Sequence, residues 1–397
     1  MQRGGTMRDI IRSFIKLALT AAATFSVLGM AANTTGKSST APATAKKAPA
    51  PAKPAARASQ TAQKRRAVRA IEPAYASATV GDIVDGEDLM VRRAAVEALG
   101  PRAGTVVVVD PNTGRVLSIV NQKLAFKSGF KPCSTIKVVA ALAALSEGLI
   151  ERGTKLRLGM RLTMDLTEAL ALSNNPYFAQ LGTKLGFQRV SYYSRLFGLG
   201  EKAGLNIDGE EPGLFPEAPP KEIGVGMMTS YGMGINLTPL ELAALMSAIA
   251  NGGTLYYLQY PRSAQEAGSL APRVKRHLDI QQFIPELRPG MLGAVEYGTA
   301  KRAAYDPNEP IYGKTGTCND FQSARTHLGW FGAFNETGRA KLVVVVLVTG
   351  WGRTTNGALA SEIAGNVFKT LSQQNFSASR QGSAPASLVA SQSCCGN

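Results

Sequence analysis

Residues 134–150 of the chain read STIKVVAALAALSEGLI. The stretch follows Pro132, opens with a serine and continues in alanine and leucine, so it predicts a helix that begins at Ser134. Residues three apart share a helix face, which brings the Ser134 hydroxyl beside the Lys137 amine. Because the helix is apolar after Lys137 and points into a core, a charge at this position needs a specific reason.

A serine and a lysine one helical turn apart can act as nucleophile and base. A hydroxyl becomes a good nucleophile only when a base takes its proton, and burial or nearby cations turn lysine into that base by lowering its pKa. Backbone N–H groups at a helix start can also stabilise an oxyanion. S-x-x-K is nevertheless a common spacing, and by itself it usually marks a solvated pair.

Strand signals lie on both sides of this helix, at the two ends of the ordered sequence. Residues 105–120 (TVVVVDPNTGRVLSIV) indicate strand, turn and strand. Strands are also expected over residues 311–318, 328–335 and 342–349, a helix capped by Thr238 over 239–251, and a final helix over 358–371. The predicted fold class is α+β: an antiparallel sheet flanked by helices, with an inserted mainly helical subdomain.

Charge and composition exclude several classes of protein. The net charge of the 397 residues is +16, but residues 1–75 carry +11 of it, so the folded part is only mildly basic and nucleic-acid binding is not expected. The only histidines are His277 and His327, and no two of the four cysteines form C-x-x-C. A histidine-rich metal centre and a zinc ribbon are thereby excluded, and no metal or cofactor is predicted.

The chain begins with the pattern of an export signal. Four basic residues within the first 16 precede an uncharged apolar stretch over 17–32, so residues 1–32 predict a signal peptide or an N-terminal membrane anchor. Residues 33–78 form an Ala/Pro/Lys-rich linker and residues 376–397 a flexible tail around the folded domain at 79–375. We expect an exported cell-envelope protein on the periplasmic side of the inner membrane, anchored or released by cleavage.

Two further motifs follow the S-x-x-K motif. Residues 173–175 (SNN) alone indicate a turn or a helix cap, and residues 314–317 (KTGT) alone indicate a strand or a turn. In this order, S-x-x-K, S-x-N and K-T-G form the motif set of penicillin-binding proteins and class A β-lactamases. The chain resembles the penicillin-binding transpeptidase domain over about residues 100–370, including the opening hairpin and residues 230–256 and 326–334.

The resemblance implies acyl transfer without a histidine or an aspartate. Ser134 would be the acylated nucleophile and Lys137 its base. Ser173 would relay a proton between Lys137, Lys314 and the leaving amine. Lys314 would supply positive potential that lowers the pKa of its partners.

The resemblance also implies substrate-binding residues. Asn175 would hold a substrate amide. Thr315 and Thr317, with Gly316 between them, would bind the carboxylate of a terminal D-alanine or of a β-lactam. The backbone N–H groups of Ser134 and Thr317 would form the oxyanion hole.

The implied activity is that of a peptidoglycan D,D-transpeptidase, which cross-links stem peptides and is inhibited by β-lactams. A D,D-carboxypeptidase or a serine β-lactamase is the alternative, in which water takes the acyl group. Glu210 and Glu211 lie where a class A β-lactamase has its deacylating glutamate, although a solvated loop acid is the simpler interpretation. A non-catalytic penicillin-binding sensor or scaffold is a further alternative, and no oligomeric state is predicted.

The sequence departs from the family pattern in three places. Ser134 and Ser173 are only 39 residues apart, which predicts a trimmed helical subdomain or a displaced S-x-N loop. Cys133 beside the nucleophile is interpreted as a packing residue. Export would also permit a disulfide involving Cys133 and Cys318, but spacing does not assign the pair. Because only a linker precedes the domain, we expect a compact stand-alone transpeptidase domain.

Overall fold

The computed structural model describes residues 78–127, 129–304, 306–320, 325–336, 341–374 and 376. The predictions of an export signal, a linker and a flexible tail therefore lie outside the described residues, except at residues 78 and 376. Within the described ranges, no helix has both the length and the hydropathy needed to span a bilayer.

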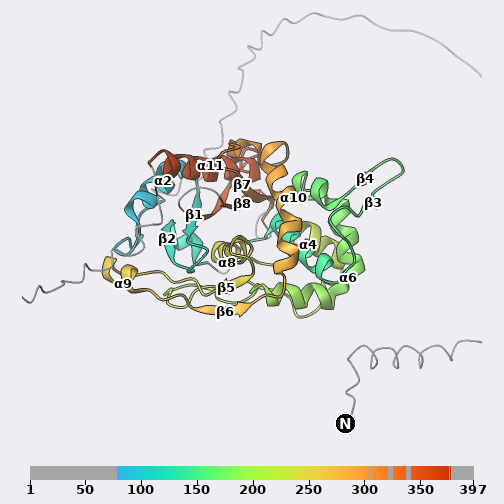
Figure 1. Cartoon of the computed structure of the whole chain (residues 1–397), viewed down its shortest axis with the longest axis horizontal. Coiled ribbons are helices and arrows are strands. Elements are labelled where there is room, and N and C mark those ends of the chain that lie inside the picture. The colour runs from blue at the N-terminus through green and yellow to red at the C-terminus, as the bar shows by residue number, and fades with distance from the viewer. Residues whose placement is uncertain are drawn as a thin grey trace, which may run out of the picture. The chain divides into compact units, whose positions relative to one another are not determined.

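A five-stranded antiparallel sheet forms the centre of the described structure (Figure 1). Its order is β2-β1-β9-β8-β7. The strands are β1 (Gly104–Val109), β2 (Val116–Val120), β7 (Ile311–Asn319), β8 (Thr326–Asn335) and β9 (Val343–Trp351). β1 pairs with β9 through a register that includes Val107 and Val345, so the first hairpin joins the last strands of the chain as predicted.

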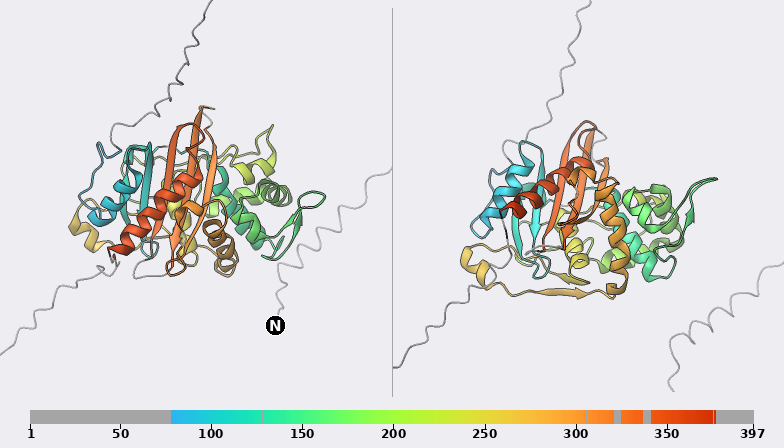
Figure 2. Two further views of the ribbon diagram at one scale, coloured as in Figure 1. Left: turned by 90° about the horizontal axis from the view of Figure 1, so that it is seen from above. Right: turned by 45° about the horizontal axis from the view of Figure 1, so that its top comes forward.

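Helices cover both faces of this sheet. Along β9, Val343, Val345 and Leu347 belong to one apolar core, and the alternate valines belong to the other. α8 (Pro239–Ala250) packs on the first face, whereas α2 (Leu89–Leu99) and α11 (Gly357–Gln373) pack on the second. Figure 2 shows α11 lying across the strands. Burial on both faces explains why β9 is a continuous apolar run rather than an alternating one.

The remaining elements lie between β2 and β7 in the chain. They are α3 (Gln122–Ala125), η1 (Cys133–Ile136), α4 (Lys137–Ser146), β3 (Leu156–Arg157), β4 (Thr163–Met164), α5 (Leu166–Ala171), α6 (Asn175–Leu196), α7 (Gly224–Tyr231), β5 (Thr254–Tyr256), α9 (Ala264–Ser269), β6 (Val274–His277), η2 (Gln281–Phe283), α10 (Ile284–Glu296) and η3 (Lys301–Ala303). Among them, α4, α5, α6, α7 and α10 form the predicted helical insertion, in which α4 packs on α6, α6 on α7 and α5 on α10. Figure 1 shows α4, α6 and α10 together at one end of the sheet, so the α+β prediction is confirmed.

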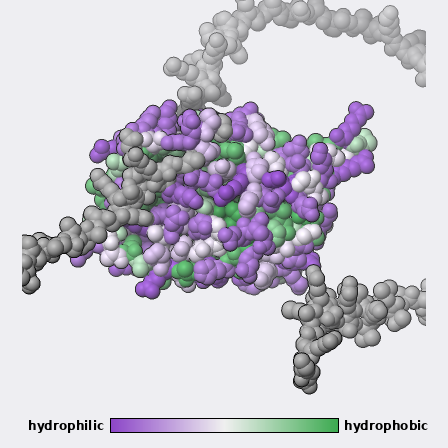
Figure 3. Space-filling view, viewed as in Figure 1, coloured by the Kyte–Doolittle hydropathy of each residue, from purple (hydrophilic) through white to green (hydrophobic). Residues whose placement is uncertain are grey.

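The helix predicted over residues 239–251 is α8, which begins as expected. The Thr238 side chain accepts the Glu241 backbone N–H, and the Glu241 carboxylate accepts the Thr238 N–H in return. This capping box satisfies two N–H groups that the first helical turn leaves unpaired. Polar side chains predominate on the molecular face in Figure 3, as expected for a domain whose apolar residues fill two cores.

Candidate active site

Ser134 lies in a 3₁₀ turn rather than in the first turn of an α-helix. The 3₁₀ segment η1 runs from Cys133 to Ile136, and α4 begins at Lys137. The predicted helix therefore starts three residues later, and it ends at Ser146 instead of 150. A 3₁₀ helix has three residues per turn, so side chains at i and i+3 are eclipsed. This geometry aligns Ser134 with Lys137 more closely than an α-helix does.

The Lys137 amine lies at the centre of a polar cluster inside the protein. Its side chain is fully buried, and its Nζ lies 3.0 Å from Ser134 Oγ and 3.0 Å from Ser173 Oγ. The same atom lies 2.7 Å from the Ser173 carbonyl oxygen and 2.6 Å from Asn175 Oδ1. The ring of Phe178 is 5.6 Å away, a contact that no sequence motif indicated. The structure thus brings together four of the predicted site residues.

The hydrogen-bonding partners of Lys137 determine whether its neutral amine can accept a proton. A neutral amine has two N–H donors and one lone pair. The Ser173 carbonyl and Asn175 Oδ1 only accept hydrogen bonds, so they take both donors. The lone pair is then left for one hydroxyl, and Ser134 Oγ and Ser173 Oγ both lie 3.0 Å away. A neutral Lys137 can therefore take a proton from either serine, and it is within reach of that of Ser134.

Burial supplies the neutral amine. Burial and, to a smaller extent, the nearby charge of Lys314 together lower the pKa of Lys137 to about 6. Burial also lowers the pKa of Lys314, to about 7. Lys137 is thus mostly neutral at pH 7, which is the state that a general base requires.

Ser173 reaches this cluster through the tight turn between α5 and α6. Its φ of 55° lies in the left-handed region, which is sparsely populated for residues other than glycine. The predicted helix cap is present at Asn174, whose side chain accepts the Tyr177 N–H. The expectation of a displaced S-x-N loop is wrong, because Ser173 contacts Lys137 despite the short spacing.

Lys314 approaches Ser173 from β7, a distant part of the chain. Its Nζ lies 2.8 Å from Ser173 Oγ, although 141 residues separate the two. Its side chain is 1% exposed, and it also donates to the Thr315 carbonyl oxygen at 3.0 Å. The Ser173 hydroxyl therefore lies between the two lysine amines, as a proton relay requires.

The rest of the K-T-G motif lies along β7, on the edge that faces η1. A Cβ at Gly316 would lie 2.9 Å from the Pro132 carbonyl oxygen, so only glycine permits this approach. Thr315 Oγ1 is 2.6 Å from Thr299 Oγ1, a partner that the motifs did not reveal. Thr317 is exposed, and its hydroxyl accepts the Gly357 N–H at 2.8 Å.

A family model described as penicillin binding protein transpeptidase domain matches residues 104–369. The chain belongs to this family. Stage V sporulation protein D of Bacillus subtilis is 29% identical over 293 residues, which cover 66% of this chain and 44% of that protein. Peptidoglycan D,D-transpeptidase PbpA of Mycobacterium tuberculosis is 27% identical over 69% of this chain and 68% of its own length. The chain spans about half the length of several curated relatives that it matches.

Solved penicillin-binding proteins share the fold. The transpeptidase domain of Burkholderia pseudomallei penicillin-binding protein 3 superposes with a TM-score of 0.62 at 20% identity, covering 73% of this chain and 94% of that one. Pseudomonas aeruginosa PBP2, solved in complex with WCK 5153, gives a TM-score of 0.60 at 22% identity, covering 72% and 77%. These similarities confirm the predicted transpeptidase-domain fold.

The transpeptidase domain also holds a disulfide between Cys133 and Cys318, with the two Cα atoms 5.6 Å apart. The interpretation of Cys133 as a packing residue is therefore incomplete, because its buried sulfur is bonded to β7. The sequence left the pairing open, although each cysteine adjoins one of the three predicted motifs.

Glu210 is not the solvated loop acid of the simpler interpretation. It is 3% exposed, and its carboxylate accepts the N–H groups of Ala203 and Gly204. Burial raises its pKa, and these hydrogen bonds oppose the rise. Its partners lie within its own loop, so Glu210 stabilises that loop. Glu211 is exposed.

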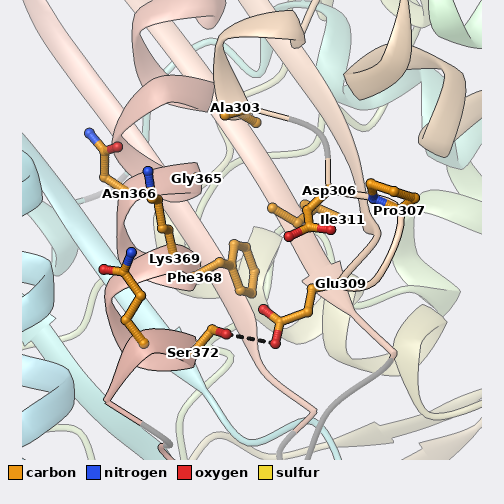
Figure 4. Close-up of a pocket in the computed structure, with 12 residues that line it drawn as sticks. Ala303, Asp306, Pro307, Glu309, Ile311, Gly365, Asn366, Phe368, Lys369 and Ser372 are labelled. Atoms are coloured by element: carbon orange, nitrogen blue, oxygen red, sulfur yellow. Dashed lines mark hydrogen bonds between the residues drawn. The ribbon is translucent and has the colours of Figure 1, made fainter.

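A separate cavity of about 430 Å³ lies between α11 and the segment that leads into β7 (Figure 4). Asp306, Glu309 and Lys369 contribute charged groups to it, and Ser372 Oγ donates to Glu309 at 2.6 Å. None of the predicted site residues lines this cavity. Among the described residues, no cluster of His, Cys, Asp and Glu is suited to hold a metal ion.

Proposed function

We propose that this protein is a peptidoglycan D,D-transpeptidase that works through an acyl-enzyme on Ser134. The observation that carries the proposal is the buried Lys137 amine, which contacts Ser134, Ser173 and Asn175 at once. Relatives named peptidoglycan D,D-transpeptidase support the same reaction. We further propose that β-lactams inhibit the protein by acylating Ser134.

Acylation begins with proton transfer from Ser134 Oγ to the neutral Lys137 amine. The oxygen then attacks the carbonyl carbon of the penultimate D-alanine, and the developing oxyanion takes hydrogen bonds from the Ser134 and Thr317 N–H groups. The intermediate collapses as the C–N bond to the terminal D-alanine breaks. The leaving amine receives its proton through the Ser173 hydroxyl, which lies between the amines of Lys137 and Lys314.

Deacylation uses the same residues in the reverse direction. The amine of a neighbouring stem peptide attacks the ester carbonyl and loses a proton to the relay. The ester bond to Ser134 then breaks, and its oxygen regains a proton from Lys137. Transfer to an amine instead of water distinguishes the transpeptidase from the carboxypeptidase and the β-lactamase.

Substrate recognition falls to the residues that border this cluster. Asn175 directs its Oδ1 to Lys137, so its amide N–H₂ is the group that would bind a substrate carbonyl. Thr315, Gly316 and Thr317 would hold the terminal carboxylate along the edge of β7. The cationic Lys314 would add positive potential at this end of the site.

We propose that residues 1–32 export the protein and anchor it or are cleaved, and that the linker over 33–78 separates the domain at 79–375 from the membrane. Residues 376–397 would form a tail. This arrangement would place the active site in the cell envelope on the periplasmic side of the inner membrane, where its substrate lies. The relatives named peptidoglycan D,D-transpeptidase support an envelope location.

The test is intact-mass measurement of the chain after timed incubation with benzylpenicillin. We expect a long-lived penicilloyl adduct that is absent from Ser134→Ala and present in Ser269→Ala, a control at an exposed serine of α9. Rapid penicillin hydrolysis without a lasting adduct would identify a β-lactamase. Incubation with a pentapeptide donor and an amine acceptor then separates cross-linking from release of the hydrolysed tetrapeptide.

A further inference from the structure

The Cys133–Cys318 disulfide adjoins both halves of the expected oxyanion hole. Cys133 immediately precedes Ser134, and Cys318 immediately follows Thr317. The two backbone N–H groups that would bind the oxyanion therefore belong to residues directly beside the bonded pair. This bond joins two cysteines that are 185 residues apart in the sequence, and it thereby constrains the distance between the two donors beside them.

Polar contacts of Lys131 help to hold the nucleophile turn against the sheet: its amine donates to the Asn319 carbonyl oxygen at 3.4 Å, and its carbonyl oxygen accepts the Trp330 indole N–H at 2.9 Å. β7 is an edge strand that pairs with β8 on one side, and its other side faces η1. Within the described structure, no backbone hydrogen bond joins Cys133–Ile136 to residues 315–318. Side-chain packing around Gly316, the Lys131 contacts and the disulfide therefore position the nucleophile turn against the strand, and only the disulfide joins the residues next to the two N–H donors covalently.

The backbone at Cys133 adds a second argument. Its φ of 51° is left-handed, a conformation that residues with a Cβ retain only when their surroundings hold them in it. The rotation about Cys133 orients the peptide plane that carries the Ser134 N–H. If the Cys133 sulfur were released, the backbone at Cys133 could relax to negative φ. The Ser134 N–H would then turn away from the expected position of the oxyanion, which the Thr317 N–H would still face.

We propose that the Cys133–Cys318 disulfide is a positioning element for acyl transfer, which keeps the Ser134 and Thr317 N–H groups directed at one oxyanion. The inference rests on the proposed function. Its consequence is specific to the transition state, because the oxyanion exists only after attack. Breaking the bond should lower the acylation rate constant and leave the affinity of the initial noncovalent complex largely unchanged.

The test measures the acylation rate constant and the dissociation constant of the initial benzylpenicillin complex by rapid quench. The proteins are the full chain, Cys133→Ser, Cys318→Ser and the double variant. All carry Cys394→Ser and Cys395→Ser, and this background is first shown to match the natural chain. A fifth sample is the full chain reduced with dithiothreitol and desalted, in which the disulfide gains two electrons and two protons while the reagent forms its own cyclic disulfide.

We expect the rate constant to fall roughly 10- to 100-fold, less than the 10²–10³-fold loss caused by removing an oxyanion donor outright. The dissociation constant should change less than about threefold. Both single variants, the double variant and the reduced chain should behave alike, since each lacks the same bond. Reoxidation of the reduced chain should restore the rate.

A matched pair tests the role of the backbone. With Cys318→Ser in both proteins, Cys133→Gly should acylate faster than Cys133→Ala, because glycine adopts positive φ without steric cost. An unchanged rate constant in the double variant, or unequal and additive single effects, would overturn the inference. If the variants do not fold, the reduced chain provides the same comparison. If the oxidised natural chain itself is not acylated, the proposed function fails and this inference fails with it.

Discussion

Acylation of Ser134 should follow a bell-shaped pH profile set by the two buried lysines. Lys137 must be neutral to accept the proton, so the rate rises as pH increases through its pKa of about 6. Lys314 must be cationic to attract the substrate carboxylate, so the rate falls as pH increases through about 7. The perturbation is pH alone, and the protein remains unaltered.

The size of the effect follows from these two values. At pH 6.5 each lysine is in its required state about three-quarters of the time, so the competent fraction is about 0.6. At pH 5 and at pH 8 one of the two lysines is correct only about a tenth of the time, which gives a drop of about sixfold on each side. A solvated Lys137 with the ordinary pKa of 10.5 would instead be neutral in only about 0.03% of molecules at pH 7.

The assay is the second-order acylation constant for benzylpenicillin from pH 5 to pH 9, which reports the free protein. At saturating benzylpenicillin, the bound carboxylate should raise the pKa of Lys314 and move the descending limb to higher pH. Lys137→Arg should abolish acylation, because arginine stays charged, whereas Lys314→Arg should retain part of it. A rate that rises steadily to pH 9 or above would refute the assignment of Lys137 as a buried neutral base.

Three further predictions concern the same scaffold. Lys137→Met should stabilise the fold at pH 7 by a few kcal/mol. Between about pH 6 and pH 10.5, Lys137 is protonated in the unfolded chain and neutral in the folded chain, so folding has to remove a proton that the methionine variant never binds. Thermal melts should show this gain shrinking as the pH rises towards 10.5, and a gain independent of pH would contradict the reasoning. Gly316→Ala should lower the free energy of unfolding by roughly 1–3 kcal/mol and slow acylation at least tenfold, since its Cβ would lie 2.9 Å from the Pro132 carbonyl oxygen. An unaltered acylation rate would contradict this prediction, because it would show that β7 tolerates the displacement. Thr238→Ala should cost about 1 kcal/mol in denaturant titrations and leave acylation unchanged, because the capping box supports α8 away from the cluster.

The short-range features of the protein could be predicted because they depend on neighbouring residues. The β1–β2 hairpin, the buried run of β9 and the Thr238 cap were each indicated by patterns within a few residues. The S-x-x-K spacing likewise placed Ser134 beside Lys137 for any helical backbone. Even here the helix type was missed, because a 3₁₀ turn and an α-helical turn share the same sequence signals.

The sequence by itself determined the three motifs, the strands at both ends of the domain and the family. The family resemblance implied that Ser173 and Lys314 meet, but only the tertiary structure brings the two within 2.8 Å across 141 residues. Only the tertiary structure, too, decided that Cys133 is bonded to Cys318 and that Glu210 is buried. Local propensity cannot specify such contacts, because they form when the sheet and the helical insertion pack against each other. The lowered pKa of Lys137 has the same origin, since burial by distant parts of the chain, rather than its neighbours in sequence, makes the amine a base.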